Sequence, residues 1–229
     1  MDFELPAKAE EMDALELLKY ASSLGDSCVF ASSFGPEDMV ILDMLHLLGS
    51  GMRVITIDTG RLPEETYELI EDSRRKYGMR IEILFPDYKD VEEMVRTHGI
   101  NLFRTSVEMR KLCCRVRKVL PLNRMLEGMG AWVTGLRREQ ADTRQFVSKC
   151  ARDPQRNLIK ICPLADWTEG MVWNYVREHA VPVSSLHSMG YRSIGCEPCT
   201  RAVAPWEDQR AGRWYWEDGQ KECGLHVSH

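Results

Sequence analysis

Short apolar runs alternate with amphipathic segments over most of the chain, which is the pattern of repeated strand–helix units. The runs expected to form strands are 27–32, 53–58, 80–85, 131–134 and 158–162. Helices are expected over 36–48, from Pro63 to Gly78, around 91–98 and after Thr168. This order predicts an α/β fold, in which a mainly parallel sheet carries helices on both faces.

The periodicity fades from Pro182 onward, where Gly, Pro, Trp and charged residues dominate. We expect this part to form an irregular extension or lid over the sheet. The predicted organisation is a main domain over 1–204 and a C-terminal tail over 205–229, which carries Cys223. A chain of 229 residues is long enough for one full domain with such an appendage.

The composition is typical of a globular protein, with 44% apolar and 28% charged residues. A formal net charge of −5 argues against broad binding to nucleic acid or to a membrane surface. The acidic segment 1–11 lacks the basic and apolar regions of a signal peptide, so we expect a cytoplasmic protein. In that reducing compartment, clustered cysteines bind metals or catalyse more often than they form disulfides. A homo-oligomer is compatible with these features.

Loops that follow three of the expected strands carry residues suited to binding an anion. In an open parallel sheet, ligands bind at the carboxyl ends of the strands. Serine hydroxyls, glycine turns and helix N-termini offer N–H and O–H donors, and arginine donates in pairs to phosphate or sulfate. Any one loop could simply cap a helix or face solvent, but together they predict an anion site. The candidate residues are Ser32, Ser33, Phe34, Gly35, Glu37, Asp38, Asp58, Thr59, Gly60, Arg61, Gly135, Arg137 and Arg138.

Five cysteines form the most specific pattern: the adjacent pair Cys113 and Cys114, the Cys-x-x-Cys pair Cys196 and Cys199, and Cys223. Four thiolates satisfy either tetrahedral zinc or an iron–sulfur cluster, and the spacing does not choose between them. Adjacent residues on a regular helix project about 100° apart. The adjacent pair would therefore reach a larger cluster if the backbone bends between them.

Five cations lie within nine residues around the adjacent cysteine pair: Arg110, Lys111, Arg115, Arg117 and Lys118. They could offset the charge of thiolates and of an anionic substrate. A basic, solvent-facing helix is the alternative. The remaining thiols, Cys28, Cys150 and Cys162, lie in or beside mixed or apolar segments and are expected to be buried and unreactive.

Three distant motifs, in this order, resemble those of the cluster-containing assimilatory adenylyl-sulfate (APS) reductases. They are Cys113-Cys114, the segment 195–201 (Gly-Cys-Glu-Pro-Cys-Thr-Arg) and the segment 221–226 (Lys-Glu-Cys-Gly-Leu-His). The resemblance covers nearly the whole chain. It implies an adenine-nucleotide α-hydrolase-like fold, a [4Fe–4S] cluster on Cys113, Cys114, Cys196 and Cys199, and Cys223 as the nucleophile.

The same resemblance implies a reaction of sulfate assimilation and cysteine biosynthesis. Adenosine 5′-phosphosulfate (APS) would be reduced to sulfite and AMP through an S-sulfocysteine on Cys223, with thioredoxin as reductant. We expect Lys118 to lie between cluster and substrate, and Arg117 to bind substrate. Arg137, Arg138, Arg210 and Arg213 are expected to hold the sulfate and phosphate.

In related ATP pyrophosphatases the first loop usually has two glycines, and Phe34 stands where the first would be. We expect its ring to hinder a pyrophosphate, which fits a substrate with one phosphate and a sulfate. Reduction of 3′-phosphoadenylyl sulfate (PAPS), or of both substrates, is the nearest alternative, although relatives with that preference generally lack the four cysteines. A tRNA-thiolating enzyme is disfavoured by Phe34 and the acidic charge. A zinc module would leave Cys223 and the anion loops unexplained.

Overall fold

Six short strands form a single sheet in the order β3-β2-β1-β4-β6-β5. The computed structural model describes residues 4–218 together with Gly224 and Leu225. Neighbouring strands are parallel except β5 and β6, which are antiparallel. The strands are β1 (Cys28–Ala31), β2 (Arg53–Ile57), β3 (Ile81–Leu84), β4 (Ala131–Val133), β5 (Cys150–Asp153) and β6 (Leu158–Ile161).

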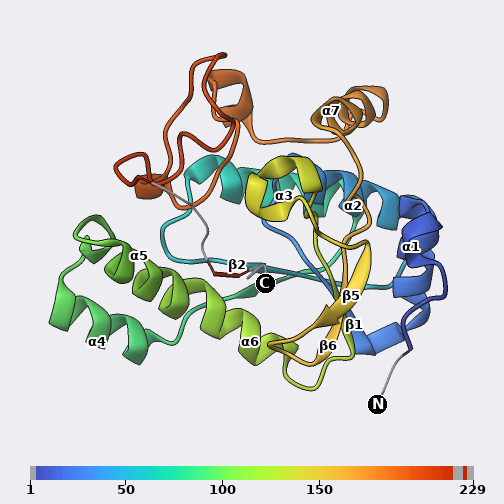
Figure 1. Ribbon diagram of the computed structural model, residues 1–229, viewed down its shortest axis with the longest axis horizontal. Coiled ribbons are helices and arrows are strands. Elements are labelled where there is room, and N and C mark those ends of the chain that lie inside the picture. Colours follow the sequence, from blue (N-terminus) through green and yellow to red (C-terminus); the bar gives the residue numbers. More distant parts are fainter. Residues whose placement is uncertain (1–3, 219–223, 226–229) are drawn as a thin grey trace.

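Helices cover both faces of this sheet (Figure 1). One apolar cluster packs α1, α2, α3 and α7 on one face, and another packs α6 on the opposite face. The predicted α/β class is therefore confirmed. The helices are α1 (Ala14–Ser23), α2 (Pro36–Leu47), α3 (Glu64–Tyr77), α4 (Tyr88–His98), α5 (Val107–Cys114), a π-helical turn (Arg115–Val119), α6 (Leu120–Leu126) and α7 (Glu169–Glu178). Short 3₁₀ turns cover Ala9–Glu11, Gly25–Ser27, Leu102–Arg104, Arg138–Gln140, Asp142–Arg144, Ser185–Met189 and Glu197–Cys199.

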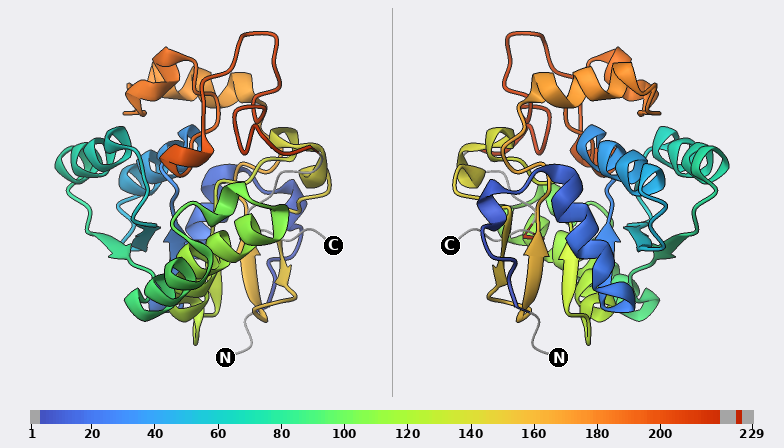
Figure 2. Two further views of the ribbon diagram at one scale, coloured as in Figure 1. Left: turned by 90° about the vertical axis from the view of Figure 1, so that its left-hand side faces the viewer. Right: turned by 90° about the vertical axis from the view of Figure 1, so that its right-hand side faces the viewer.

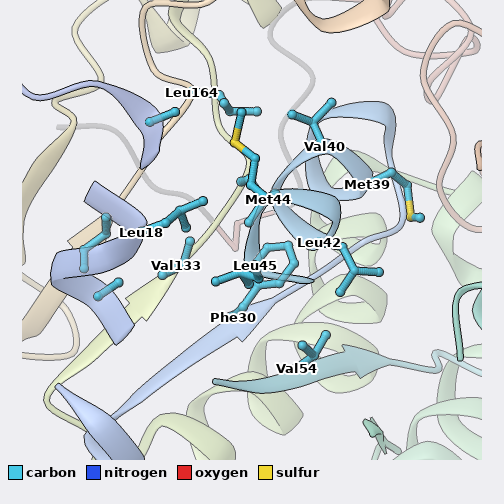
Figure 3. Packing of buried hydrophobic residues seen from close by; sticks show 14 of the residues in the cluster. Leu18, Phe30, Met39, Val40, Leu42, Met44, Leu45, Val54, Val133 and Leu164 are labelled. Atoms are coloured by element: carbon cyan, nitrogen blue, oxygen red, sulfur yellow. The ribbon is translucent and has the colours of Figure 1, made fainter. Parts of the chain in front are cut away.

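Helix α2 lies at the centre of the main core. Its residues 38–45 are all buried, because the sheet, α1, α3 and α7 surround it. Phe30, Val54 and Val133 alternate with residues that face α6, and they pack against Leu42 and Leu45 of this helix (Figure 3). A helix enclosed in this way must be apolar nearly all round, and its N-terminus is held rigidly at the edge of the sheet.

The predicted strands are confirmed to within two residues at each end. Pro63 is the residue before α3 rather than its first residue, while Gly78 ends the helix with φ 62° as expected. Helix α1 and the edge strand β5 were not predicted. Asp13 and Glu16 form a reciprocal capping box at the start of α1, a sequence signature that could have revealed it.

The connections along the chain reverse direction between β1 and β4. Strands β2 and β3 lie on one side of β1, and β4, β6 and β5 lie on the other. Such a switch point leaves a crevice at the carboxyl ends of the strands. The C-terminal segment, coloured orange to red, lies beside this edge (Figure 2). Within the described ranges, no helix has both the length and the apolar character needed to cross a bilayer.

Candidate functional site

A cavity of about 230 Å³ lies at the switch point, and we call it the large cavity. Loops that follow β1, β2 and β4 form one side of it, and the C-terminal segment forms the other. Its apolar part includes Ile55, Leu122, Trp132 and Leu225. The predicted site residues that line it are Ser32, Ser33, Gly35, Glu37, Asp38, Thr59, Lys118, Gly135, Arg210 and Arg213.

The first loop uses several of its donors internally. The carboxylate of Asp38 accepts hydrogen bonds from the Ser33 N–H, from the Ser33 hydroxyl at 2.8 Å and from the Gly135 N–H at 3.0 Å. Ser32 Oγ accepts from the Phe34 N–H at 3.1 Å. Burial outweighs these bonds and raises the pKa of Asp38 to about 6. Some of the N–H and O–H groups that were expected to bind a ligand thus donate to the carboxylate of Asp38 instead.

Phe34 does not obstruct the large cavity, contrary to the expectation from the sequence. Its φ is 60°, a left-handed conformation that is common for glycine and rare for phenylalanine. This turn directs the ring into the main core, where only 3% of the residue is exposed. The backbone therefore has a conformation that favours glycine, and the side chain contributes to packing.

Gly135 brings the loop after β4 against the loop after β1. A Cβ at this position would lie 2.3 Å from Asp38 Oδ1, far inside van der Waals contact. Only glycine allows its N–H to approach the carboxylate this closely. Asp38 and Gly135 together fasten the two loops across the switch point.

Arg137 and Arg138 lie outside the lining of the large cavity. Arg137 is 1% exposed and pairs with Glu37 at 2.8 Å and Glu139 at 3.2 Å. Arg138 pairs with Glu10 at 2.6 Å. The two arginines connect elements of the fold instead of facing the cavity.

Arg144 is an arginine of this loop that does line the large cavity, and sequence reasoning missed it. It is buried, and its Nη1 donates to Gln140 Oε1 at 2.6 Å. Four further polar residues that were missed come from the C-terminal segment: His187, Arg192, Ser193 and Gln209. The only available signal was the continuation of the polar loop beyond Gln140 and of the polar segment beyond Pro182.

A second, smaller cavity, which we call the cysteine cavity, collects Cys113, Cys114, Cys196 and Cys199. All four are buried. The first two end α5, and the π-helical turn begins directly after Cys114 rather than between them. Cys196 directly precedes the 3₁₀ turn Glu197–Cys199, and Cys199 is the last residue of this turn. Across residues 4–218 and 224–225, no group of three or more His, Cys, Asp or Glu converges tightly enough for a single metal ion.

Arg61 and Arg117, predicted to bind substrate, line the cysteine cavity instead. Arg117 Nη1 donates to the Thr59 carbonyl at 2.7 Å, and Arg61 Nη2 donates to the Ile100 carbonyl at 2.7 Å. Asp58 and Gly60, which are also predicted site residues of the loop after β2, lie outside the lining of both cavities. Asp58 accepts from the Gly60 N–H at 2.7 Å, which closes the loop between the cavities.

Lys118, Arg213 and Trp214 line both cavities and form the wall between them. Thr59 Oγ1 lies 3.3 Å from Cys196 Sγ, within hydrogen-bonding distance. Burial raises the pKa of Cys199 to about 11. Burial also acts to raise the pKa of Cys196, but Lys118, the Thr59 hydroxyl and Arg213 together outweigh it, so this pKa is lowered.

Several buried donors around the cysteine cavity have no hydrogen-bond partner in the described part of the chain: Arg117 Nε, Arg213 Nε and Trp214 Nε1. An unsatisfied buried donor costs about 1–3 kcal/mol. Four thiols and these N–H groups therefore fit a ligand that is bound by sulfur and accepts hydrogen bonds. Cys223, the predicted nucleophile, lies outside the described residues.

These features define an α/β protein with a ligand cavity at the switch point of its sheet and a thiol-lined cavity beside it. The sequence profile of the phosphoadenosine phosphosulfate reductase domain matches residues 27–202, and the chain belongs to this family.

The chain is 49% identical to the adenosine 5′-phosphosulfate reductase of Burkholderia cepacia, over 98% of this chain and 90% of that protein. Phosphoadenylyl-sulfate (PAPS) reductase from Candida auris, in a phosphate complex, has a similar structure with a TM-score of 0.73 and 27% identity, covering 89% of this chain and all of that one. FMN adenylyltransferase from Candida glabrata shares the fold at a TM-score of 0.57 and 14% identity, over 80% of this chain and 59% of that one.

Proposed function

We propose that the protein reduces adenosine 5′-phosphosulfate to sulfite and AMP in sulfate assimilation. The observation that carries this proposal is the shared wall: Lys118 and Arg213 line both the large cavity and the thiol-lined cavity. A sulfonated nucleotide phosphate is an anion with an electrophilic sulfur, so cations are needed where it reacts. The 49% identity to a protein named for this activity supports the same substrate.

We propose that the four cysteines of the cysteine cavity hold a [4Fe–4S] cluster. The four thiols line one cavity, which fits ligation of one metal group by four thiolates, and the resemblance to cluster-containing reductases favours iron–sulfur over zinc. The unpartnered N–H groups of Arg117, Arg213 and Trp214 are suitable donors to its sulfurs. When bound, the cluster would fix four thiolates and add negative charge beside Lys118 and Arg213.

The chain's own residues would perform the first chemical step. The Cys223 thiolate attacks the sulfur of the bound substrate, the S–O bond to the phosphate breaks, and AMP leaves with that electron pair. Arg210 and Arg213 line the large cavity, where they can hold the sulfate and phosphate oxygens during the transfer. Leu225, two residues after the proposed nucleophile, lines the same cavity, which supports delivery of the thiolate from the tail.

A dithiol protein such as thioredoxin would complete the reaction in the cytoplasm. Its thiolate attacks the cysteine sulfur of the S-sulfocysteine and expels sulfite, and its second thiol resolves the mixed disulfide. Both electrons come from the dithiol, and the protein's cysteine returns as a thiolate. Positions Cys113, Cys114, Cys196 and Cys199 take no part in this exchange.

Mass spectrometry of the intact protein after incubation with APS, without reductant, tests the proposal. We expect one added SO₃ group on the tail peptide of the wild type and none on Cys223→Ser, which should keep its iron and its affinity for AMP. PAPS in a parallel incubation tests the alternative substrate. An adduct on another cysteine, or sulfite release by Cys223→Ser with reductant, would refute the proposed nucleophile.

A further inference from the structure

The guanidinium of Arg213 lies directly against the backbone of Gly195. Arg213 is 7% exposed, and its Nη1 donates to the Ile194 carbonyl at 3.1 Å and to Ser193 Oγ at 3.5 Å. A Cβ at position 195 would lie 2.2 Å from Nη2, 2.5 Å from Cζ and 2.9 Å from Nη1. The arginine therefore occupies the space in which any other residue 195 would carry its side chain.

We propose that Gly195 is a positioning residue for the transfer step. Because residue 195 has no side chain, the guanidinium of Arg213 can occupy that space and lie between the two cavities. This inference rests on the proposed function, in which Arg213 contacts the sulfonated substrate. Residue 195 directly precedes Cys196, so the loop that supplies a cysteine to the cysteine cavity also orients a cation that lines both cavities.

Backbone conformation does not explain this glycine. Gly195 does not have a positive φ, so an alanine could adopt the same backbone conformation. Its N–H donates to Thr200 Oγ1 at 3.2 Å, a bond that alanine would retain. The requirement at this position is therefore space for the guanidinium.

Gly212 shows the opposite situation, in which a side chain would meet backbone rather than the end of a flexible side chain. A Cβ there would lie 2.2 Å from the Arg201 carbonyl oxygen, a backbone atom that cannot move aside. The Arg201 N–H donates to the Gly212 carbonyl at 3.0 Å and the Trp214 N–H donates to the Cys199 carbonyl at 3.1 Å, so these two segments are paired. A side chain at 195 would displace the end of a flexible arginine and leave this pairing intact.

The experiment compares Gly195→Ala, Arg213→Ala and the double variant by the single-turnover rate of S-sulfo adduct formation with APS. The control is Gly51→Ala, since residue 51 is exposed, has no positive φ and would place its Cβ in open space. We expect Gly195→Ala to react about 10–100-fold more slowly, because displacing a reacting group by about 1 Å has effects of this size. Iron content and Tm should match the control.

The double variant provides the decisive comparison. If Gly195 acts through Arg213, adding Gly195→Ala to Arg213→Ala should slow the reaction by less than about twofold. The inference would be overturned if the two substitutions slowed adduct formation independently, so that the rate reduction of the double variant equalled the product of the two single reductions. A wild-type rate for Gly195→Ala, or loss of iron from that variant, would also overturn it. Absence of adduct in both the wild type and Gly51→Ala would instead refute the proposed function.

Discussion

The large cavity and the cysteine cavity differ in how their charged and polar groups are satisfied. In the large cavity, Asp38 accepts from Ser33 and Gly135, and the neighbouring Arg137 is paired with Glu37. Around the cysteine cavity, Arg117, Arg213 and Trp214 each retain a buried N–H without a partner among the described residues. The protein itself supplies the partners of Asp38 and Arg137, whereas these three N–H groups beside the cysteines have none among the described residues.

Because of this difference, the loops of the large cavity are stabilised without a ligand, whereas the walls of the cysteine cavity gain stability when a ligand binds. Buried pairs such as Arg137 and Glu37 are costly to break, because either partner left alone is an uncompensated charge. They hold the loops in place before any substrate binds. The unpartnered donors around the cysteines contribute to stability only when a ligand fills the cysteine cavity. Lys118 and Arg213 line both cavities, so binding of that ligand should also affect the position of these two side chains in the large cavity.

Removing one cysteine should give the largest effect and show whether the two cavities are separable. Cys196→Ala takes away a proposed cluster ligand and the partner of Thr59 Oγ1. We expect loss of iron and of visible absorption, and adduct formation reduced by at least about 100-fold, as displaced active-site groups commonly cause. Affinity for AMP, measured by calorimetry, should change less than about threefold, since the loops of the large cavity are fastened independently.

The matched control is Cys162→Ala, which removes a buried thiol that lines neither cavity. It should keep iron and activity. If Cys196→Ala lost AMP binding together with iron, the structure of the large cavity would depend on the filled cysteine cavity. The expectation that the loops of the large cavity are held independently would then be wrong.

Asp38→Asn should have a smaller effect that depends on pH. The folded pKa of about 6 exceeds the unfolded value of about 3.9, so the protonated carboxyl is favoured in the folded state. The resulting stabilisation is full below about pH 4 and is lost as pH rises through 6, in total about 3 kcal/mol. The unfolding free energy of the wild type, measured relative to that of Asp38→Asn, should therefore fall by about 2–3 kcal/mol between pH 4 and 7.

Denaturant titrations of the wild type and Asp38→Asn at several pH values measure this difference directly. Asp153→Asn is a useful comparison, because Asp153 is also buried but pairs with Arg156 at 2.8 Å. A difference between wild type and Asp38→Asn that stays constant from pH 4 to 7 would mean that the carboxylate is charged throughout, with its bonds to Ser33 and Gly135 outweighing burial.

The strands and the place of the large cavity followed from the sequence because both depend on local patterns. Runs such as 53–57 are apolar and β-branched, and parallel strands must bring their following loops to one edge. The partner of Arg137 could not be foreseen, since Glu37 is 100 residues away in the sequence. The choice of an iron–sulfur cluster for the four cysteines came from resemblance to a family, because spacing alone did not choose between zinc and iron–sulfur.

The direction of a side chain in a loop was the other feature that the sequence could not provide. Phe34 was expected to face a ligand because of the residue type at that position, yet the sign of φ decides which way the ring points. The same limit applies to Arg138 and Arg144: both belong to one polar loop, and only the fold determines which of them lines the cavity.

Phe34→Leu should give the smallest effect and test that last point. Leucine fills most of the same core space, so we expect a loss of about 1 kcal/mol in unfolding free energy and unchanged affinity for AMP and pyrophosphate. Phe34→Gly would remove about 1–2 kcal/mol of backbone strain but lose about 3–5 kcal/mol of buried ring, and should be the less stable variant. If either substitution strengthened pyrophosphate binding, the ring would be acting as a barrier in the large cavity, and the assignment of Phe34 to the core would be wrong.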